Sequence, residues 1–130
     1  VVVELGPMDK PMAAMRACLD ELLTHWGIDA AAQKTLSRRV APRGYRGTWA
    51  TTADYPAQML LQHKSAVIHF RLMVDAKGKP TACVIQIPGD AAFDKITCDL
   101  MMQRARFNPA LDATGAPIAS FVVSSLRWLI

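Results

Sequence analysis

The chain has 130 residues, enough for one folded domain or for a small domain with an ordered extension. Its 52% hydrophobic and 20% charged residues are typical of a globular protein and exclude an intrinsically disordered one. No apolar run reaches the roughly 18 residues of a membrane-spanning helix. The net charge of +4 would suit nucleic acid. However, no aromatic interleaving forms a stacking platform in the basic segment, so we expect no nucleic-acid partner.

The first elements are a short apolar strand and a helix. Val1–Leu5 has the composition of a terminal strand, and we expect its sheet to lie partly upstream, in a longer or processed protein. Residues 9 to 27 predict a helix, capped by Asp9, with Pro11 in its first turn and Gly27 at its end. We interpret the apolar stripe of this helix as a face that packs on a neighbouring domain, in preference to an adaptable binding face. The apolar stripe consists of Met12, Met15, Leu19, Leu22, Leu23 and Trp26.

The next segment predicts little regular structure. Residues 29 to 33 predict a short second helix. Residues 35 to 54 are rich in Arg, Gly, Pro and Thr and are interpreted as a solvated linker that Tyr45 and Trp49 pin to a surface. The basic residues gather in and beside this segment, at Lys34, Arg38, Arg39, Arg43 and Arg46.

A hairpin follows a short helix. Pro56 starts a predicted helix over residues 57 to 63. Apolar residues then alternate with polar ones from Ile68 to Val74, the period of a strand with one buried face. Asp75–Gly78 predicts a turn in which the glycine supplies a positive φ, and residues 81 to 87 predict the returning strand.

The last elements are a helix and a strand. After the break at residues 88 to 90, apolar spacing predicts a helix from Phe93 to about Arg104. Pro109 prevents the helix from continuing, and residues 112 to 115 predict another turn. Residues 120 to 130 predict the closing strand. The order predicts an α+β fold, with helices on a three-stranded antiparallel sheet and an extra N-terminal helix.

Residues 55 to 130 resemble the C-terminal domain of TonB-family energy transducers. The resemblance rests on Tyr55-Pro56 before a short helix, the D-x-x-G turn Asp75–Gly78, the run Arg106-Phe107-Asn108-Pro109, and the closing strand. The order and spacing of these pieces carry it, because each piece alone is common. It divides the chain into an extension, residues 1 to 54, and a TonB-like domain, residues 55 to 130.

The resemblance implies a periplasmic protein-binding module. In the family, an extended peptide of a TonB-dependent outer-membrane transporter pairs with the edge strand, and force from an inner-membrane motor complex passes through it. We therefore expect a full-length protein that is either anchored to the inner membrane or secreted, with the motor contacted through an upstream region. Exchange of strands into a homodimer is left open. The expected partner-binding residues are Tyr55, Pro56, Ser120, Val122, Ser124 and Leu126.

Two alternatives to this function stand beside it. In the first alternative, the edge strand is covered by residues 1 to 54 or by a second copy of the chain, since proteins protect long apolar edges. In that case the chain is a TonB-like interaction or scaffold domain of a larger periplasmic protein, without energy coupling. The other alternative is a thiol enzyme with a cysteine–histidine dyad. Such a dyad would pair Cys83 or Cys98 with His63 or His69. Because both cysteines fall on apolar faces, where a thiol is inert, we predict no enzymatic activity, no cofactor and no metal site.

The three cysteines, at positions 18, 83 and 98, match no zinc spacing. Cys83 shares a strand face with Ile85, and Cys98 lies on the following helix, so we predict a Cys83–Cys98 disulfide with Cys18 reduced. A strand and a helix must cross closely for such a bridge. Two buried thiols are the alternative. A bridge requires an oxidising compartment, which the resemblance also implies.

Overall fold

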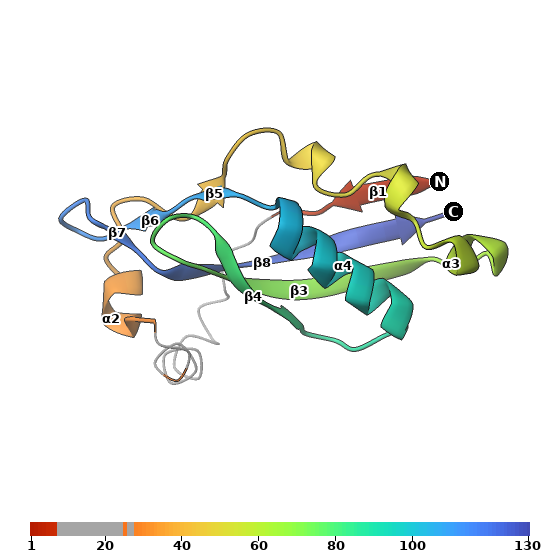
Figure 1. Ribbon diagram of the computed structural model, residues 1–130. Coiled ribbons are helices and arrows are strands. Elements are labelled where there is room, and N and C mark those ends of the chain that lie inside the picture. Colours follow the sequence, from red (N-terminus) through yellow and green to blue (C-terminus); the bar gives the residue numbers. More distant parts are fainter. Residues whose placement is uncertain (8–24, 26–27) are drawn as a thin grey trace.

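The computed structural model describes residues 1–7, 25 and 28–130 (Figure 1). Apart from residue 25, the predicted helix over residues 9 to 27 lies outside these residues, and so do its Gly27 cap and Cys18. The fold is α+β and is built on a four-stranded antiparallel sheet with strand order β1-β8-β3-β4. These strands are β1 (Val2–Leu5), β8 (Ser120–Leu129), β3 (Ala66–Val74) and β4 (Pro80–Ile85). The helices are α2 (Ala30–Gln33), α3 (Ala57–Leu61) and α4 (Ala91–Arg104).

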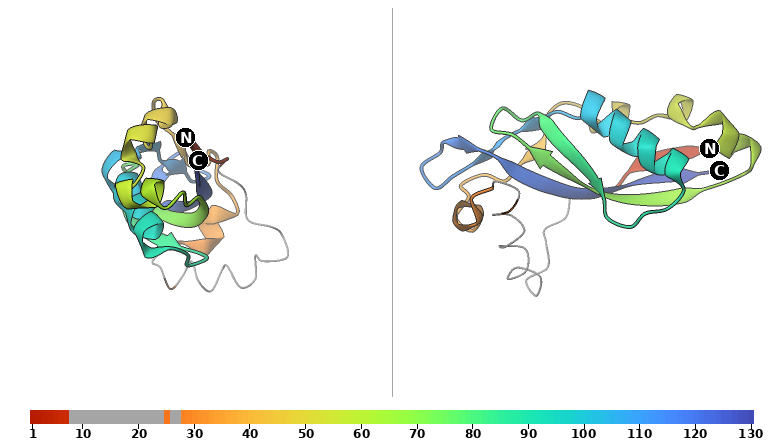
Figure 2. Two further views of the ribbon diagram at one scale, coloured as in Figure 1. Left: turned by 90° about the vertical axis from the view of Figure 1, so that its right-hand side faces the viewer. Right: turned by 60° about the horizontal axis from the view of Figure 1, so that its bottom comes forward.

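The sheet has one strand more than the sequence predicted. The hairpin and the closing strand supply three strands as expected, and β1 adds the fourth beside β8. The prediction of three strands is therefore corrected, because residues 2–5 find their partner within this chain. Both ends of the chain lie together at one end of the sheet (Figures 1 and 2).

The β3–β4 hairpin follows the predicted alternation. Ile68, Phe70, Leu72 and Val74 are buried, while Val67 and His69, on either side of Ile68, are exposed. Asp75 organises the turn, since its Oδ1 accepts hydrogen bonds from the backbone N–H groups of residues 77 and 79, both at 2.9 Å. β4 ends at Ile85, earlier than predicted, and Ile87 is left 66% exposed.

Gly78 in this turn is required for two reasons. Its φ of +85° lies in the left-handed region, which other residues rarely adopt. A Cβ atom built on it would lie only 1.9 Å from the carbonyl oxygen of Phe107. The Phe107 N–H in turn donates to the carbonyl of Gly78 at 2.9 Å. The turn is therefore docked closely against the chain that follows α4.

Helix α4 packs along one face of the sheet (Figures 1 and 2). Asp90 caps it, its side chain accepting from Ala92 N–H at 3.1 Å. Phe93, Leu100 and Met101 are buried on its sheet side. The helix ends because Ala105 is extended, with ψ near 134°, and Phe107 then pairs as a strand.

The segment predicted as a linker packs against the domain. Beyond the confirmed helix α2, it contains β2 (Ala41–Pro42) and the 3-10 helices η2 (Arg46–Thr48) and η3 (Thr52–Asp54). β2 pairs with β5 (Phe107–Asn108), and a second ribbon joins β6 (Ala110–Leu111) to β7 (Pro117–Ile118). Trp49 is 4% exposed and contacts Phe107 edge-on at 5.3 Å, as expected of an anchor, whereas Tyr45 is 79% exposed.

One core therefore crosses the predicted boundary at residue 54. Trp49 and Ala50 belong to the same buried cluster as Phe70, Met101 and Trp128, and β1 packs Val3 and Leu5 against it. No helix in the described part of the chain is long and apolar enough to cross a membrane.

Candidate functional site

The β8 strand carries four of the six predicted binding residues, and all four have buried side chains. Val122 and Leu126 are 6% and 0% exposed and belong to the core. The Ser124 hydroxyl donates to the carbonyl oxygens of Gly6 and Pro7 at 3.0 and 3.1 Å. The Ser120 hydroxyl donates to Gln33 Oε1 at 2.5 Å. These side chains position the strand but are not presented to solvent.

The Tyr55-Pro56 pair, also predicted to bind the partner, lies beneath the C-terminal end of β8. Tyr55 is 5% exposed and contacts Trp128 and Phe93 edge-on at 5.6 and 5.7 Å. Its hydroxyl donates to the carbonyl oxygen of Lys64. Pro56 is half-buried and forms the N-cap of α3. The pair therefore supports β8 from within the core.

The backbone of β8 is what a neighbouring strand contacts. β1 pairs with it antiparallel, with Val2 opposite Leu129 and Leu5 opposite Leu126, and the Gly6 N–H donates to the Ser125 carbonyl at 2.7 Å. In an antiparallel pair, backbone hydrogen bonds recur at every second residue. From Ser125 this alternation selects Arg127 and Leu129 as the residues whose backbone groups face β1.

The predicted set thus names the even positions of β8, whereas the odd positions offer their backbone to a neighbour. The signal was present in the sequence. The apolar Val122, Leu126 and Trp128 share one phase of the strand, and Ser125 and Arg127 occupy the other. A residue of β8 whose side chain enters the core, such as Leu126, directs its backbone groups toward β3 and away from β1.

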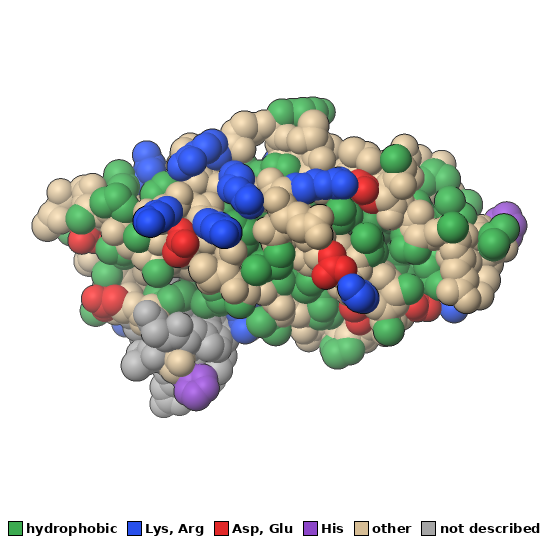
Figure 3. Space-filling view, in the orientation of Figure 1, with side chains coloured by type: hydrophobic (Ala, Val, Ile, Leu, Met, Phe, Trp, Pro, Cys, Tyr) green, Lys and Arg blue, Asp and Glu red, His purple; other side chains and the backbone are tan. Residues whose placement is uncertain are grey.

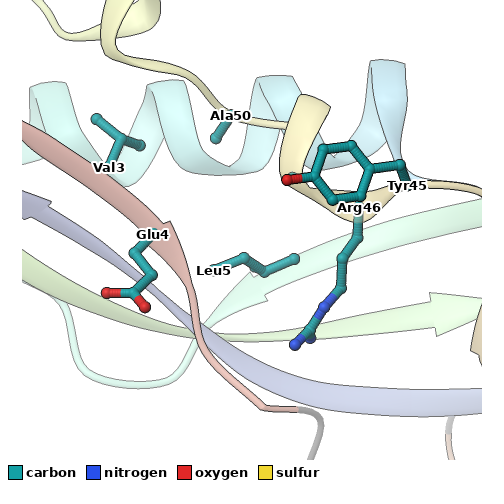
Figure 4. A pocket seen from close by; sticks show the side chains of 7 residues that line it. Val3, Glu4, Leu5, Tyr45, Arg46 and Ala50 are labelled. Carbon is teal, nitrogen blue, oxygen red and sulfur yellow. The ribbon is translucent and has the colours of Figure 1, made fainter.

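β1 covers this edge with side chains that are half-buried or exposed. Val3 and Leu5 are half-buried against the core, while Val1 and Val2 are 57% and 48% exposed. On the other side of the strand, Glu4 lies 3.6 Å from the guanidinium of Arg127. Figure 4 shows Val3 and Glu4 pointing to opposite sides of β1. From Val3 to Leu5 the strand that covers the edge therefore reads apolar, acidic, apolar, with the acidic side chain on the other face.

A groove of about 320 Å³ lies between β1 and the η2 turn. It is lined by Val3, Leu5, Tyr45, Arg46 and Ala50, together with Glu4 and Gly47. In Figure 4, the Tyr45 ring and the Arg46 side chain lie over the side of the groove opposite β1. Arg46 also donates to the Gly6 carbonyl at 3.0 Å, at the end of β1.

The opposite edge of the sheet is fixed by the cysteine pair. The Sγ atoms of Cys83 on β4 and Cys98 on α4 lie 2.08 Å apart, with Cα atoms 5.6 Å apart. The helix and strand therefore cross as closely as the predicted bridge requires. Because the two sulfurs face each other, neither is placed as the thiol of a cysteine–histidine dyad.

A basic patch covers the far end of the domain. Lys77 and Lys79 flank Gly78, and Arg43 lies beside it, next to the end of β2, where its N–H donates to the Arg106 carbonyl just before β5. All four side chains are exposed. Figure 3 shows Lys and Arg side chains gathered in this region. The patch lies at the end of the sheet away from the chain termini, so it is separate from the β1–β8 edge (Figure 1).

Asp54 and Arg104 form a bidentate ion pair. The carboxylate accepts two hydrogen bonds from the guanidinium, at 2.7 and 3.0 Å, and also accepts from the Thr51 N–H at 2.8 Å. The hydrogen bond from Arg104 is the main cause that lowers the pKa of Asp54, while partial burial opposes it. This pair ties the turn before Tyr55 to the last turn of α4.

The described residues contain no group of three or more His, Cys, Asp or Glu side chains that could hold a metal ion. Comparison with protein families, with curated proteins and with solved structures gives no match. The geometry at the β8 edge is therefore the basis for a functional proposal.

Proposed function

We propose that this chain is a periplasmic protein-binding module of the TonB C-terminal type. It takes an extended peptide of an outer-membrane TonB-dependent transporter as an added strand beside β8. A full-length protein would then couple an inner-membrane motor to transport. The observation that carries the proposal is the β8 edge, where β1 already pairs antiparallel through backbone groups. Strand addition of this kind needs few specific side chains on the receiving edge.

The packing of β8 supports a role in bearing force. β8 pairs with β3 from Ser120 opposite Val74 to Trp128 opposite Ala66, so load along β8 acts in shear across the whole of β3. Trp128 ties the strand to α4, since its indole N–H donates to the Thr97 hydroxyl at 3.0 Å inside the core. A peptide pulled along this edge would therefore act on the rigid body of the domain.

The second candidate is a TonB-like interaction or scaffold domain without energy coupling. The coverage of the edge by β1 favours it, because a module that only holds a larger periplasmic protein together needs no free edge. The two candidates share the binding edge and differ in whether a transporter reaches it.

The binding test is a titration of the isotope-labelled chain with a short extended peptide from a transporter, followed by amide resonances. We expect shifts along residues 118 to 128 and near Tyr55. Shifts confined to the basic residues 34 to 46 would contradict strand addition and indicate electrostatic contact.

Energy coupling is tested separately in cells. Single cysteines at Arg127 and at Lys95 give a matched pair, since Arg127 lies on the β8 edge and Lys95 on the exposed side of α4, with a side chain 77% exposed. We expect the Arg127→Cys protein to cross-link a transporter that carries a cysteine in its periplasmic peptide, and the Lys95→Cys protein not to. Equal cross-linking at both positions, or none at either, would favour the scaffold function.

A further inference from the structure

The segment that occupies the proposed binding edge belongs to the chain itself. β1 lies antiparallel to β8, where an added peptide would have to lie, and covers Leu126–Leu129. An added strand and β1 cannot both pair with the same backbone groups of Arg127 and Leu129. A partner that uses this edge must therefore replace β1.

We infer that β1 stands in for the partner's strand and shows its chemistry. The partner segment is extended and antiparallel to β8, with two apolar residues at the positions of Val3 and Leu5 and an acidic residue between them. This inference rests on the proposed function and deepens it, because it names the peptide class that the edge accepts.

The side chains of β1 explain this pattern. Val3 is opposite Trp128 and Leu5 is opposite Leu126, and side chains at opposed positions share one face of a sheet. That face leads into the core and the groove beneath the η2 turn. Glu4 is opposite Arg127 on the other face, 3.6 Å from its guanidinium. A replacing strand meets the same three environments.

The short length and partial burial of β1 lead us to expect that it can be replaced. The strand has four residues, and neither of its core-facing side chains is fully buried. Side-chain hydrogen bonds hold the chain just beyond its end, where the Gly6 carbonyl accepts from Arg46 at 3.0 Å and from the Ser124 hydroxyl at 3.0 Å. β1 can therefore leave the edge while residue 6 stays in place.

A tethered strand competes with any free peptide. The tether gives β1 an effective concentration on the order of millimolar at the edge. The apparent affinity for a free peptide equals the affinity of the open edge multiplied by the fraction of molecules in which the edge is open. Weakening β1 should consequently tighten peptide binding, an effect opposite to that of ordinary structural damage.

The experiment uses a synthetic peptide with the sequence of residues 1 to 6, blocked at both ends, and measures its binding by calorimetry and amide shifts. In the Leu5→Asp variant β1 loses its apolar contact while the edge itself is unchanged. We expect the apparent Kd for the peptide to fall roughly tenfold relative to the unaltered chain. Glu4→Pro, which removes an N–H directed at β8, is a second variant with the same expected direction.

The reverse experiment locks β1 in place. Glu4 and Arg127 are an opposed, hydrogen-bonded pair, and such pairs have Cα atoms about 5.5 Å apart, within disulfide range. In a Cys18→Ser background, the oxidised Glu4→Cys/Arg127→Cys protein should bind the peptide at least roughly tenfold more weakly than the Glu4→Ser/Arg127→Ser control. Retained dispersion of the β3 and α4 amides shows that each variant is folded.

The outcomes separate the inference from the proposed function. Tighter binding to Leu5→Asp or Glu4→Pro, together with loss in the locked protein, supports the inference. Equal binding to the locked and control proteins would overturn the inference about β1, and strand addition would then have to occur at another edge. Failure of the residue 1 to 6 peptide to bind any variant would also overturn it. The transporter-peptide titration then judges the proposed function independently.

The acidic position has its own check. A peptide with Lys in place of Glu4 should bind the Leu5→Asp protein more weakly than the original peptide, and the added Arg127→Glu change should reverse that order. An unchanged order in the Arg127→Glu protein would overturn the assignment of Arg127 as the residue that faces the partner's acidic side chain.

Discussion

The two edges of the sheet are protected in different ways. On one side, β4 begins at Pro80, which has no N–H to offer, and it is joined to α4 through Cys83 and Cys98. On the other side, β8 is covered by the four residues of β1, of which Val3 and Leu5 are half-buried and Val2 and Glu4 are exposed. The β4 edge is tied to the helix by a bridge, whereas β1 is held on β8 by backbone pairing and by side chains that stay partly exposed. This difference underlies our inference that a partner pairs with β8 and not with β4.

The largest expected effect concerns β8 itself, which should be indispensable even though its cover is not. Trp128 is fully buried, and its indole N–H is satisfied by Thr97. We expect Trp128→Ala to lower the free energy of unfolding by about 3–5 kcal/mol, because a large cavity and an unpaired hydroxyl remain. Leu129→Ala, at a half-buried position of the same strand, should cost about 1 kcal/mol. Similar losses in chemical denaturation would contradict the assignment of Trp128 to the core.

The second prediction breaks the β4 edge. Replacing both Cys83 and Cys98 by Ser should lower the free energy of unfolding by about 3 kcal/mol, as expected for a closed loop of 15 residues. Amide exchange should rise along β4 and remain unchanged along β3 next to β8. Mass spectrometry of the non-reduced wild-type protein should find one alkylatable thiol, at Cys18. Three alkylatable thiols after periplasmic expression would contradict both the bridge and the proposed location.

The third prediction tests the tie between α4 and the turn that supports Tyr55. Asp54→Asn should cost about 1 kcal/mol, since it removes an ion pair whose cation is partly exposed and weakens the hydrogen bond from the Thr51 N–H by removing the charge. Asp99→Asn, which breaks an exposed pair with Lys95, should change stability by less than about 0.5 kcal/mol. Equal effects of the two changes would contradict a special role for Asp54.

This contribution also depends on pH. The folded state lowers the pKa of Asp54 below its unfolded value, so the unfolded state binds the proton more readily. The stabilisation is fully present above the unfolded value of about 4 and is lost as pH falls through the lower folded value. The difference between wild type and Asp54→Asn, measured by denaturation, should therefore shrink below about pH 4. A difference that is constant from pH 7 to pH 2.5 would contradict this.

The smallest expected effect lies on the exchangeable edge. Glu4→Gln should change the free energy of unfolding by less than about 0.5 kcal/mol, because both partners of the Glu4–Arg127 pair are about half exposed. Amides of β1 should nevertheless exchange with solvent faster than those of β4 by hydrogen–deuterium exchange. Slower exchange in β1 than in β4 would reverse the order of the two edges.

Local patterns in the sequence determined the hairpin, α4, the Asp75 turn and the closing strand. Alternation of apolar residues, the cap at Asp90 and the glycine at position 78 act within a few residues, so they are legible without tertiary structure. The cysteine pair could also be foreseen, because its strand and helix are neighbours in the chain and their apolar faces oppose each other.

Only the tertiary structure decided what lies beside β8. The pairing of residue 2 with residue 129 joins the ends of the chain, and nothing in a four-residue apolar strand specifies its partner. The packing of Trp49 against Phe107 likewise converts a Gly- and Arg-rich segment into part of the core. Such long-range contacts depend on the complete fold, because each burial becomes favourable only after the sheet and α4 have formed the surface that receives it.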